Sequence, residues 1–345
     1  MSGLTPSSAA TLTLDNFFRS LKNAESRTFR LARQQVPADM LKPALCDMSD
    51  APSHFFAEPK PRPPPRPLGS LHLQASVGDY LGHGHSSVVF ALEGVHLSDA
   101  PTGAQVPELV VKVARINRVT SLIRETWYYD EMEVLQGVAL PRCYGYFEAT
   151  LSADADEKEL LHRLFKKFPA EVDEDHNAAL NRDTLIGPLH PVLEERRTRR
   201  DILAVLVMER LGSRLPIGLP VPEETRQDII GLYEEIGHFC VDNSRDARVQ
   251  NILRAPPSPP GLPSLPSPFT QRVHNWRLID FEFAMQTNLS IFNLEYLYLV
   301  EVKGMFRDIE ADTEEEYENL IEDEDGGEDW YDSGDDEGDD DSSSD

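Results

Sequence analysis

Short apolar runs separated by turn residues dominate the chain between residues 68 and 208. They lie at residues 71–77, 87–92, 109–113, 143–149 and 202–208. Runs of this length, bounded by Gly, Pro or Asp, predict β-strands. Between the third and the fourth run, residues 120–136 repeat apolar side chains at helical spacing and predict one helix.

The pattern changes after residue 208. Residues 222–241 predict a helix, because Glu223 and Glu224 suit its first turn and apolar residues lie along one side. Two short apolar runs, 252–253 and 276–281, flank a Pro/Ser-rich loop at 255–268, and residues 291–306 predict a final helix. Five strands with one helix, followed mainly by helices, predict an α+β fold of two lobes.

Residues 1–50 form a polar extension with one amphipathic stretch at 14–31, where Leu14, Phe17, Phe18 and Leu21 suggest helical spacing. We expect a helix that packs on the core. A mitochondrial presequence is the alternative, and acidic residues inside the stretch count against it. Residues 51–67 are rich in proline and predict an extended linker, while the charged segment 151–200 predicts a helical or disordered insertion.

The net charge of −27 is concentrated in a tail. Residues 308–345 contain 21 Asp and Glu and no Lys or Arg, which leaves 39 acidic and 33 basic residues elsewhere. Such a tail predicts disorder and offers a contact for basic proteins, with a solubility role as the alternative. The rest of the chain is mildly acidic, and phosphate contacts need clustered Lys and Arg, so we expect no direct binding of nucleic acid.

Three cysteines, Cys46, Cys143 and Cys240, show no CxxC spacing. An odd number without such spacing predicts neither a disulfide framework nor a zinc site and favours a reducing compartment, the cytoplasm or nucleus. We find no secretory signal pattern and no apolar run of about 18 residues, so no membrane association is expected.

Residues 82–89 have the pattern G-x-G-x-x-S-x-V between two predicted strands. Gly82 and Gly84 let a backbone approach phosphate groups closely, and Ser87 is small enough to leave similar room. Val89 suits a position that covers a nucleotide base. A simple hairpin turn is the alternative, because a glycine motif alone has low specificity.

Lys112 lies inside the apolar strand predicted at 109–113. A buried ammonium group is costly unless a carboxylate pairs with it. The following helix offers Glu125, Glu131 and Glu133, and Glu125 lies on the apolar face expected to pack on the sheet. We therefore expect a Lys112–Glu125 pair; a strand-edge lysine whose ammonium reaches water is the alternative.

Two acidic motifs follow. Asp246 and Asn251 have the spacing D-x-x-x-x-N, and Asp280 lies at the end of an apolar strand. Beside a transferable phosphate, such an aspartate accepts the proton of an attacking hydroxyl, and the asparagine and second aspartate bind Mg²⁺. Each motif alone is equally typical of a loop or a strand end.

The order of these motifs is informative. A glycine loop, a strand lysine, a helix glutamate, an apolar strand leading into residues 208–211, D-x-x-x-x-N and Asp-Phe follow one another as in protein kinases. Over residues 71–307 the chain therefore resembles the protein kinase family, and it looks most like the short, divergent kinase-like proteins of fungi. The run 135–147 is similar to the stretch after the first-lobe helix in that group.

The resemblance implies a two-lobed protein-kinase-like fold, with a β-rich N-lobe at about 68–208 and a reduced, mainly helical C-lobe at about 209–307. It also implies ATP and Mg²⁺ as cofactors. ATP contacts are expected from Gly82, Gly84, Ser87, Val89, Lys112 and the hinge residues Met208, Glu209 and Leu211. Catalysis is expected from Asp246, Lys112, Glu125 and Arg248, and Mg²⁺ binding from Asn251 and Asp280.

The chain departs from the family pattern in three places. Ser244 stands where the family has histidine, and Glu282 follows Asp-Phe in place of glycine. Only about 27 residues separate Asp280 from the acidic tail, without an A-P-E motif. An activation segment and the helices that support peptide binding do not fit in that length.

These features predict a Mg-ATP-dependent phosphotransferase that moves the γ-phosphate to a hydroxyl of a protein or small-molecule substrate. A nucleotide-binding pseudokinase or scaffold is the alternative, because the peptide-binding half is reduced. Ser258 and Ser267 each precede proline and are candidate sites of proline-directed phosphorylation; an unmodified, disordered linker is the alternative there.

Overall fold

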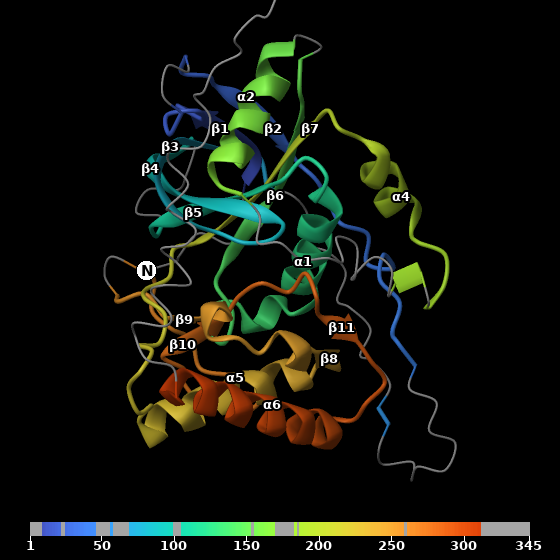
Figure 1. Cartoon of the computed structure of the whole chain (residues 1–345), viewed down its shortest axis with the longest axis vertical. Coiled ribbons are helices and arrows are strands. Elements are labelled where there is room, and N and C mark those ends of the chain that lie inside the picture. The colour runs from blue at the N-terminus through green and yellow to red at the C-terminus, as the bar shows by residue number, and fades with distance from the viewer. Residues whose placement is uncertain are drawn as a thin grey trace, which may run out of the picture.

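A computed structural model describes residues 9–21, 25–45, 56–57, 69–98, 105–152, 155–169, 183–184, 186–258 and 261–311. The acidic tail from residue 312 onward and most of the proline-rich segment 51–67 lie outside the described residues. Figure 1 shows the β-barrel in the upper half of the molecule and the helices α5 and α6 at the bottom of the molecule.

Seven strands close into a barrel in the order β1-β2-β6-β7-β5-β4-β3. Neighbouring strands are antiparallel, except that β1 runs parallel to β3. The strands are β1 (Ala9–Asp15), β2 (Phe29–Arg33), β3 (Leu71–His83), β4 (Ser87–Ser98), β5 (Leu109–Ala114), β6 (Cys143–Thr150) and β7 (Ile202–Glu209). Closure leaves this sheet without an unpaired edge.

The barrel has an apolar interior and an apolar outer face. Along β5, Val111 and Val113 belong to the interior cluster, whereas Val110 and Ala114 belong to a second cluster outside the barrel. Side chains alternate across a strand, so β5 is covered on both faces. This explains why its sequence is continuously apolar apart from Lys112.

The predicted fold class, a two-lobed protein-kinase-like α+β fold with a β-rich N-lobe and a mainly helical C-lobe, is wrong. The structure instead has a closed seven-stranded barrel with few helices. The barrel closes because β1 and β2, from the predicted N-terminal extension, lie between β3 and β6. Pairing between segments this distant in sequence leaves no local signal in the chain.

The helix predicted within residues 14–31 is also wrong, because this stretch holds the end of β1, a turn and β2. Leu14 and Leu31 lie in the barrel interior. The rings of Phe17 and Phe18 pack edge-on against Phe29, with centroids 5.1 and 5.9 Å apart. The spacing of these aromatic residues resembled a helix, but it arises from a turn that folds back on the strand.

The predicted helices within residues 120–136, 222–241 and 291–306 are confirmed. The described helices are α1 (Val119–Glu131), η3 (Glu133–Leu135), α2 (Ala155–Lys167), α4 (Pro191–Thr198), α5 (Glu223–Gly237) and α6 (Ile291–Ala311). Of the helices in the described ranges, none is both long and apolar enough to cross a membrane.

Short elements connect the two long C-terminal helices. They are β8 (Val241–Asp242), η4 (Ser244–Asp246), η5 (Val249–Asn251), β9 (Ile252–Arg254), β10 (Trp276–Leu278) and β11 (Met285–Gln286). β9 pairs with β10 and β8 pairs with β11, both antiparallel. These two antiparallel pairs flank the loops that carry the acidic motifs.

An N-terminal segment links the barrel to the C-terminal part. Past β2, the indole Nε1 of Trp127 on α1 donates to the carbonyl oxygen of Ala38 at 3.0 Å. The backbone N–H groups of Ala44 and Ala57 then donate to the carbonyl oxygens of Gln286 and Asn288 at 2.7 and 2.8 Å. In Figure 1 this segment is the blue trace that descends along one side of the molecule.

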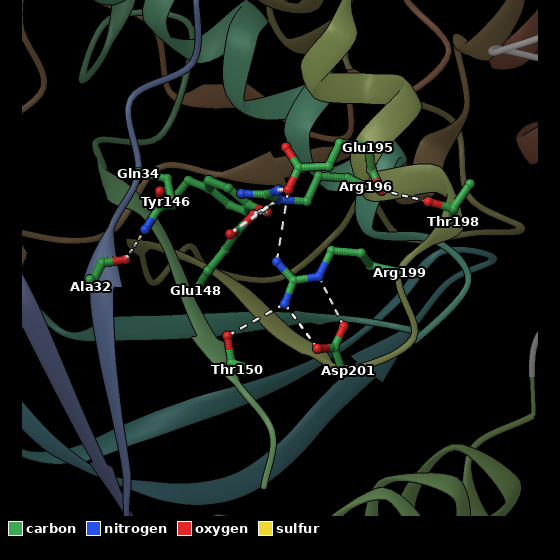
Figure 2. Close-up of polar contacts among 10 residues, drawn as sticks. All are labelled: Ala32, Gln34, Tyr146, Glu148, Thr150, Glu195, Arg196, Thr198, Arg199 and Asp201. Carbon is green, nitrogen blue, oxygen red and sulfur yellow. Dashed lines mark hydrogen bonds and ion pairs between the residues drawn. The ribbon is translucent and has the colours of Figure 1, made fainter. Parts of the chain in front are cut away.

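Arginines at the end of α4 fix the insertion to the barrel (Figure 2). Nε of Arg196 lies 2.9 Å from Oε1 of Glu148 on β6, and the hydroxyl of Tyr146 donates to the same oxygen at 2.5 Å. Arg199 donates to both oxygens of Asp201 at 2.9 Å each. The predicted charged insertion is therefore helical at α2 and α4.

The Pro/Ser-rich loop 255–268 is held by two buried arginines. Nη2 of Arg142 donates to the carbonyl oxygen of Pro263 at 2.6 Å, and Nη2 of Arg277 donates to the hydroxyl of Ser264 at 2.6 Å. The backbone N–H of Leu265 also donates to the carbonyl oxygen of Gly137 at 2.8 Å. Apart from residues 259–260, which are not described, the loop is ordered.

Ser267 is fully buried in this loop and donates its hydroxyl to Oε2 of Glu235 at 2.6 Å. A buried hydroxyl that donates to a carboxylate is out of reach of a kinase in the folded chain, so the phosphorylation hypothesis for Ser267 is wrong, as is the disordered-linker alternative at this residue. Ser258 is exposed and stays a candidate.

His274 is fully buried beside the same loop. Its Nδ1 lies 2.7 Å from Oδ1 of Asp228, and its Nε2 lies 3.5 Å from Oε1 of Glu235. Burial alone would lower the pKa of His274, but the two carboxylates outweigh burial and raise it to about 9. The imidazole is therefore charged in the folded chain at neutral pH.

Protonation of His274 contributes stability that is fully present below the ordinary pKa of 6.5 and is lost as the pH rises through about 9. Replacing it in His274→Gln removes this titration. We expect the stability advantage of the wild type over the variant to shrink by about 2 kcal/mol between pH 6 and pH 9.5. Urea unfolding at several pH values measures it; a difference that does not change with pH would contradict the charged imidazole.

Candidate functional site

The candidate site forms where the outer face of the barrel meets α1 and the loops of the C-terminal part. In the sheet register Lys112 lies opposite Val89 on β4 and Leu206 on β7. Cross-strand partners share a face of the sheet. Because Val89 and Leu206 pack into the cluster outside the barrel, the Lys112 side chain also leaves the barrel on that face.

Lys112 contacts two carboxylates. Its Nζ lies 2.7 Å from Oε2 of Glu125 on α1 and 2.9 Å from Oδ1 of Asp280. The side chains of Lys112 and Glu125 are 9% and 1% exposed, so this ion pair is screened little by water. The neighbours of Glu125 on the helix face, Leu122 and Tyr129, are buried with it.

The charges around Lys112 do not balance. Burial alone would lower the pKa of Lys112, but Asp280, Glu125 and Glu282 outweigh burial and raise it far above the ordinary value, so the ammonium stays charged. Burial raises the pKa of Glu125, and Asp280 and Glu282 add to that effect against Lys112. Three carboxylates thus share one lysine.

The D-x-x-x-x-N motif lies beside this cluster. Because β9 and β10 pair antiparallel, Asn251 before β9 and the residues after β10 emerge at the same end of the hairpin. The backbone N–H of Ile279 donates to the carbonyl oxygen of Asn251 at 3.0 Å. Nδ2 of Asn251 donates to Oδ2 of Asp246 at 2.9 Å. Asp280 itself adopts a left-handed backbone with φ of 65°, a conformation found more often at functional sites.

Asp246 is buried, and both of its carboxylate oxygens have donors. Oδ2 accepts from Asn251, and Oδ1 lies 3.2 Å from Nε of Arg248, whose side chain is 63% exposed. Burial and the nearby charge of Asp280 raise the pKa of Asp246 to about 7, while Arg248 opposes this. Arg248 therefore reaches from the solvent side toward the buried aspartate.

The glycine motif forms the tip of the β3–β4 hairpin. Gly82 pairs with Val89, and the backbone N–H of Gly84 donates to the carbonyl oxygen of Ser87 at 2.9 Å. At both glycines no atom lies within 4 Å of the position that a Cβ would take. The hairpin thus has an open backbone surface near Val89, the strand neighbour of Lys112.

The residues predicted as a hinge lie at the end of β7 and just after it. Met208 is opposite Val110, so its side chain lies on the same face of the sheet as Lys112. The carboxylate of Glu209 is buried and accepts from Nη1 of Arg142 at 2.7 Å, and its backbone N–H donates to the carbonyl oxygen of Arg142 at 2.9 Å. Leu211 follows the strand and is partly exposed.

Sequence reasoning missed the part that Glu282 plays. Glu282 is 4% exposed, contributes to the charge around Lys112, and accepts a hydrogen bond from the hydroxyl of Ser86 in the glycine hairpin. Nε of Arg124 on α1 donates to its carbonyl oxygen at 3.2 Å. The signal was present in the sequence as an acidic residue in place of glycine, which by itself indicated only reduced flexibility.

The donor set suits Mg²⁺, because carboxylate and amide oxygens are its preferred protein ligands. Oε1 of Glu125 is buried and lacks a hydrogen-bond partner among the described residues. Within the described ranges no group of three or more His, Cys, Asp and Glu side chains is arranged to hold a metal ion. A Mg²⁺ at Asp280 and Asn251 would therefore depend on further ligands, such as phosphate oxygens.

The substitution Lys112→Met tests the balance of charge. It leaves buried carboxylates without their cation, so we expect the unfolding free energy to fall by about 3–5 kcal/mol at pH 8. The loss should be smaller at pH 5.5, because carboxylates whose pKa is raised then take up protons. Urea unfolding at both pH values measures the loss of unfolding free energy, with Lys303→Met, at an exposed position, as control. An equal loss at pH 8 and pH 5.5 would contradict the imbalance of charge.

Comparisons with known proteins do not assign the chain to a family. No protein-family model and no curated protein matches the chain. A solved structure titled "WaaP in complex with acyl carrier protein" is similar at 12% identity and a TM-score of 0.30, over 72% of this chain and 83% of that chain. At this identity and TM-score the similarity establishes neither a shared fold nor a shared activity.

Proposed function

We propose that this chain binds ATP with Mg²⁺ and transfers the γ-phosphate to a hydroxyl group, as protein-kinase-like phosphotransferases do. One observation carries the proposal: Lys112 lies within 2.9 Å of both Glu125 and Asp280, and the Asp246–Asn251 pair is attached to the same loop by a backbone hydrogen bond. Phosphoryl transfer needs residues of these types to bind the phosphates, to hold the metal ion and to orient the acceptor hydroxyl.

Each residue group has a role in the proposal. The two carboxylates hold the Lys112 ammonium in place, where it would bind phosphate oxygens of the nucleotide. Asp280 and Asn251 would hold Mg²⁺, which when bound neutralises charge on the phosphates. The open backbone at Gly82 and Gly84 supports close approach of phosphates, and Met208 to Leu211 would contact the base.

Asp246 would orient the acceptor hydroxyl and accept its proton. Its hydrogen bond from Asn251 fixes the carboxylate, and the exposed Arg248 would stabilise charge on the transferred phosphoryl group. The acceptor is a protein or a small molecule. Residues 281–290 lead directly from the site into α6, so they offer little surface for an extended peptide.

A nucleotide-binding pseudokinase or scaffold is the second candidate. It is favoured by the same short connection and by Asp246, whose two oxygens already have donors from Asn251 and Arg248. In this case ATP would bind without transfer, and the chain would act through contacts with other proteins.

The two candidates differ in the variant Asp246→Asn. For a phosphotransferase we expect transfer of the γ-phosphate to fall at least about 100-fold, because general base catalysis is worth that much. The affinity for Mg-ATP should change less than about threefold. Transfer is measured with labelled ATP and a panel of protein and small-molecule acceptors, and affinity by calorimetry.

Asp201→Asn is the matched control, because Asp201 pairs with Arg199 away from the site and its loss leaves Lys112 untouched. Equal turnover in the wild type and Asp246→Asn, with binding retained, would leave the pseudokinase. No binding of Mg-ATP by the wild type would overturn both candidates.

A further inference from the structure

The side chains of Ser86 and Glu282 join two distant parts of the chain. Ser86, at the tip of the β3–β4 hairpin, donates its hydroxyl to Oε2 of Glu282, in the segment after Asp280. Their residues are 5% and 4% exposed. A buried hydrogen bond to a carboxylate is stronger than one between neutral groups.

The Glu282 end of this contact is rigid. Arg124 on α1 donates from Nε to the carbonyl oxygen of Glu282 at 3.2 Å and from Nη2 to that of Ala284 at 3.1 Å. The hydroxyl of Tyr128 donates to the same Ala284 oxygen at 2.8 Å. The helix that supports this segment is also the one that carries Glu125, so the anchor of the hairpin and the partner of Lys112 share one element.

The Ser86 end is a tight turn next to two glycines with open backbone surface. Arg115 also holds this tip: its backbone N–H donates to the carbonyl oxygen of Ser86 at 2.9 Å, and its Nη2 donates to that of Gly84 at 3.3 Å. Both contacts tie the tip to β5 within the barrel. The bond to Glu282 connects it to the Asp280 segment instead, across the site.

We propose that Glu282 is a positioning residue that holds the glycine hairpin down toward Lys112 and Asp280, so that the phosphate-binding surface is already formed before a nucleotide arrives. This rests on the proposed nucleotide binding. A glycine at position 282 would offer no side chain to do so. Fixing the tip in advance lowers the entropy that the ligand has to remove on binding.

The proposal separates Glu282 from the residues that would touch the nucleotide. Its carboxylate is occupied by hydroxyl donors, Ser86 and Ser121, whereas Asp280 contacts Lys112 directly. Removing the hydroxyl of Ser86 should therefore loosen the hairpin while Lys112 keeps both of its partners.

Hydrogen exchange of the protein without nucleotide measures the position of the hairpin. The amides of Gly84 and Arg115 report it, because they donate to Ser87 and Ser86 within the tip. We expect Ser86→Ala and Glu282→Ala to speed their exchange about 10-fold or more. Glu282→Gln keeps a hydrogen-bond acceptor and Ser86→Thr keeps a hydroxyl, so in both variants these amides should exchange at the wild-type rate.

Calorimetry with Mg-ATP on the same proteins gives the second readout. We expect Ser86→Ala to weaken affinity about 10-fold and Ser86→Thr to restore it. Ser98→Ala is the matched control, because that serine contacts the carbonyl oxygen of His72 at the far end of β4. If Glu282→Ala fails to fold, Ser86→Ala carries the test alone.

If the amides of Gly84 and Arg115 exchange at the wild-type rate in Ser86→Ala, the positioning role is overturned. Tighter binding of Mg-ATP by Ser86→Ala would also overturn it, because the Ser86–Glu282 contact would then block the site. If the wild type binds no Mg-ATP, the proposed function fails. Faster exchange in Ser86→Ala would in that case still support the role of Glu282 in fixing the hairpin.

Discussion

A lysine ammonium group without water around it must find negative charge within a few ångströms, and Lys112 shapes the structure through this requirement. It lies in an apolar strand of the barrel, yet its partners come from α1 and from the segment after β10. Two consecutive elements, β5 and α1, therefore have to meet a segment that lies 168 residues after Lys112 in the sequence. The barrel supplies the rigid strand, and the other two are placed relative to it.

The same point of contact collects more negative charge than Lys112 can balance. Burial raises the pKa of Asp246 and of Glu282 to about 7, and Asp280 adds to both. Such an arrangement is costly for stability in the absence of a cation. Proteins commonly accept a cost of this kind where a ligand is to be bound. The same carboxylates that lower the stability of the loops around Asp280 are thus the ones needed for the chemistry proposed there.

Local features of the sequence predicted the strands β3 to β7, the three long helices and the choice of Glu125 as the carboxylate nearest Lys112. Periodicity is a local property of the sequence. It shows which face of its own strand or helix a residue occupies, and this was enough to identify Lys112 and Glu125 as partners. The closed barrel was not predictable in this way, because the residues that β1 and β3 pair in parallel are 61 or 62 positions apart in the sequence. Ser267 and Glu282 were misjudged for a similar reason: their partners, Glu235 and Ser86, are distant in sequence.

The link between the N-terminal segment and β11 has a consequence for how the chain folds. Ala44 bridges to Thr287 and Phe56 to Leu289, so these early residues find their partners only after residues 287–289 have been synthesised. Contacts of such long range slow folding, since the closure of a large loop precedes any gain from the contact. On the ribosome, the apolar residues of β1 emerge well before β3 can pair with them, and an apolar strand that waits for its partner is open to pairing with the wrong strand.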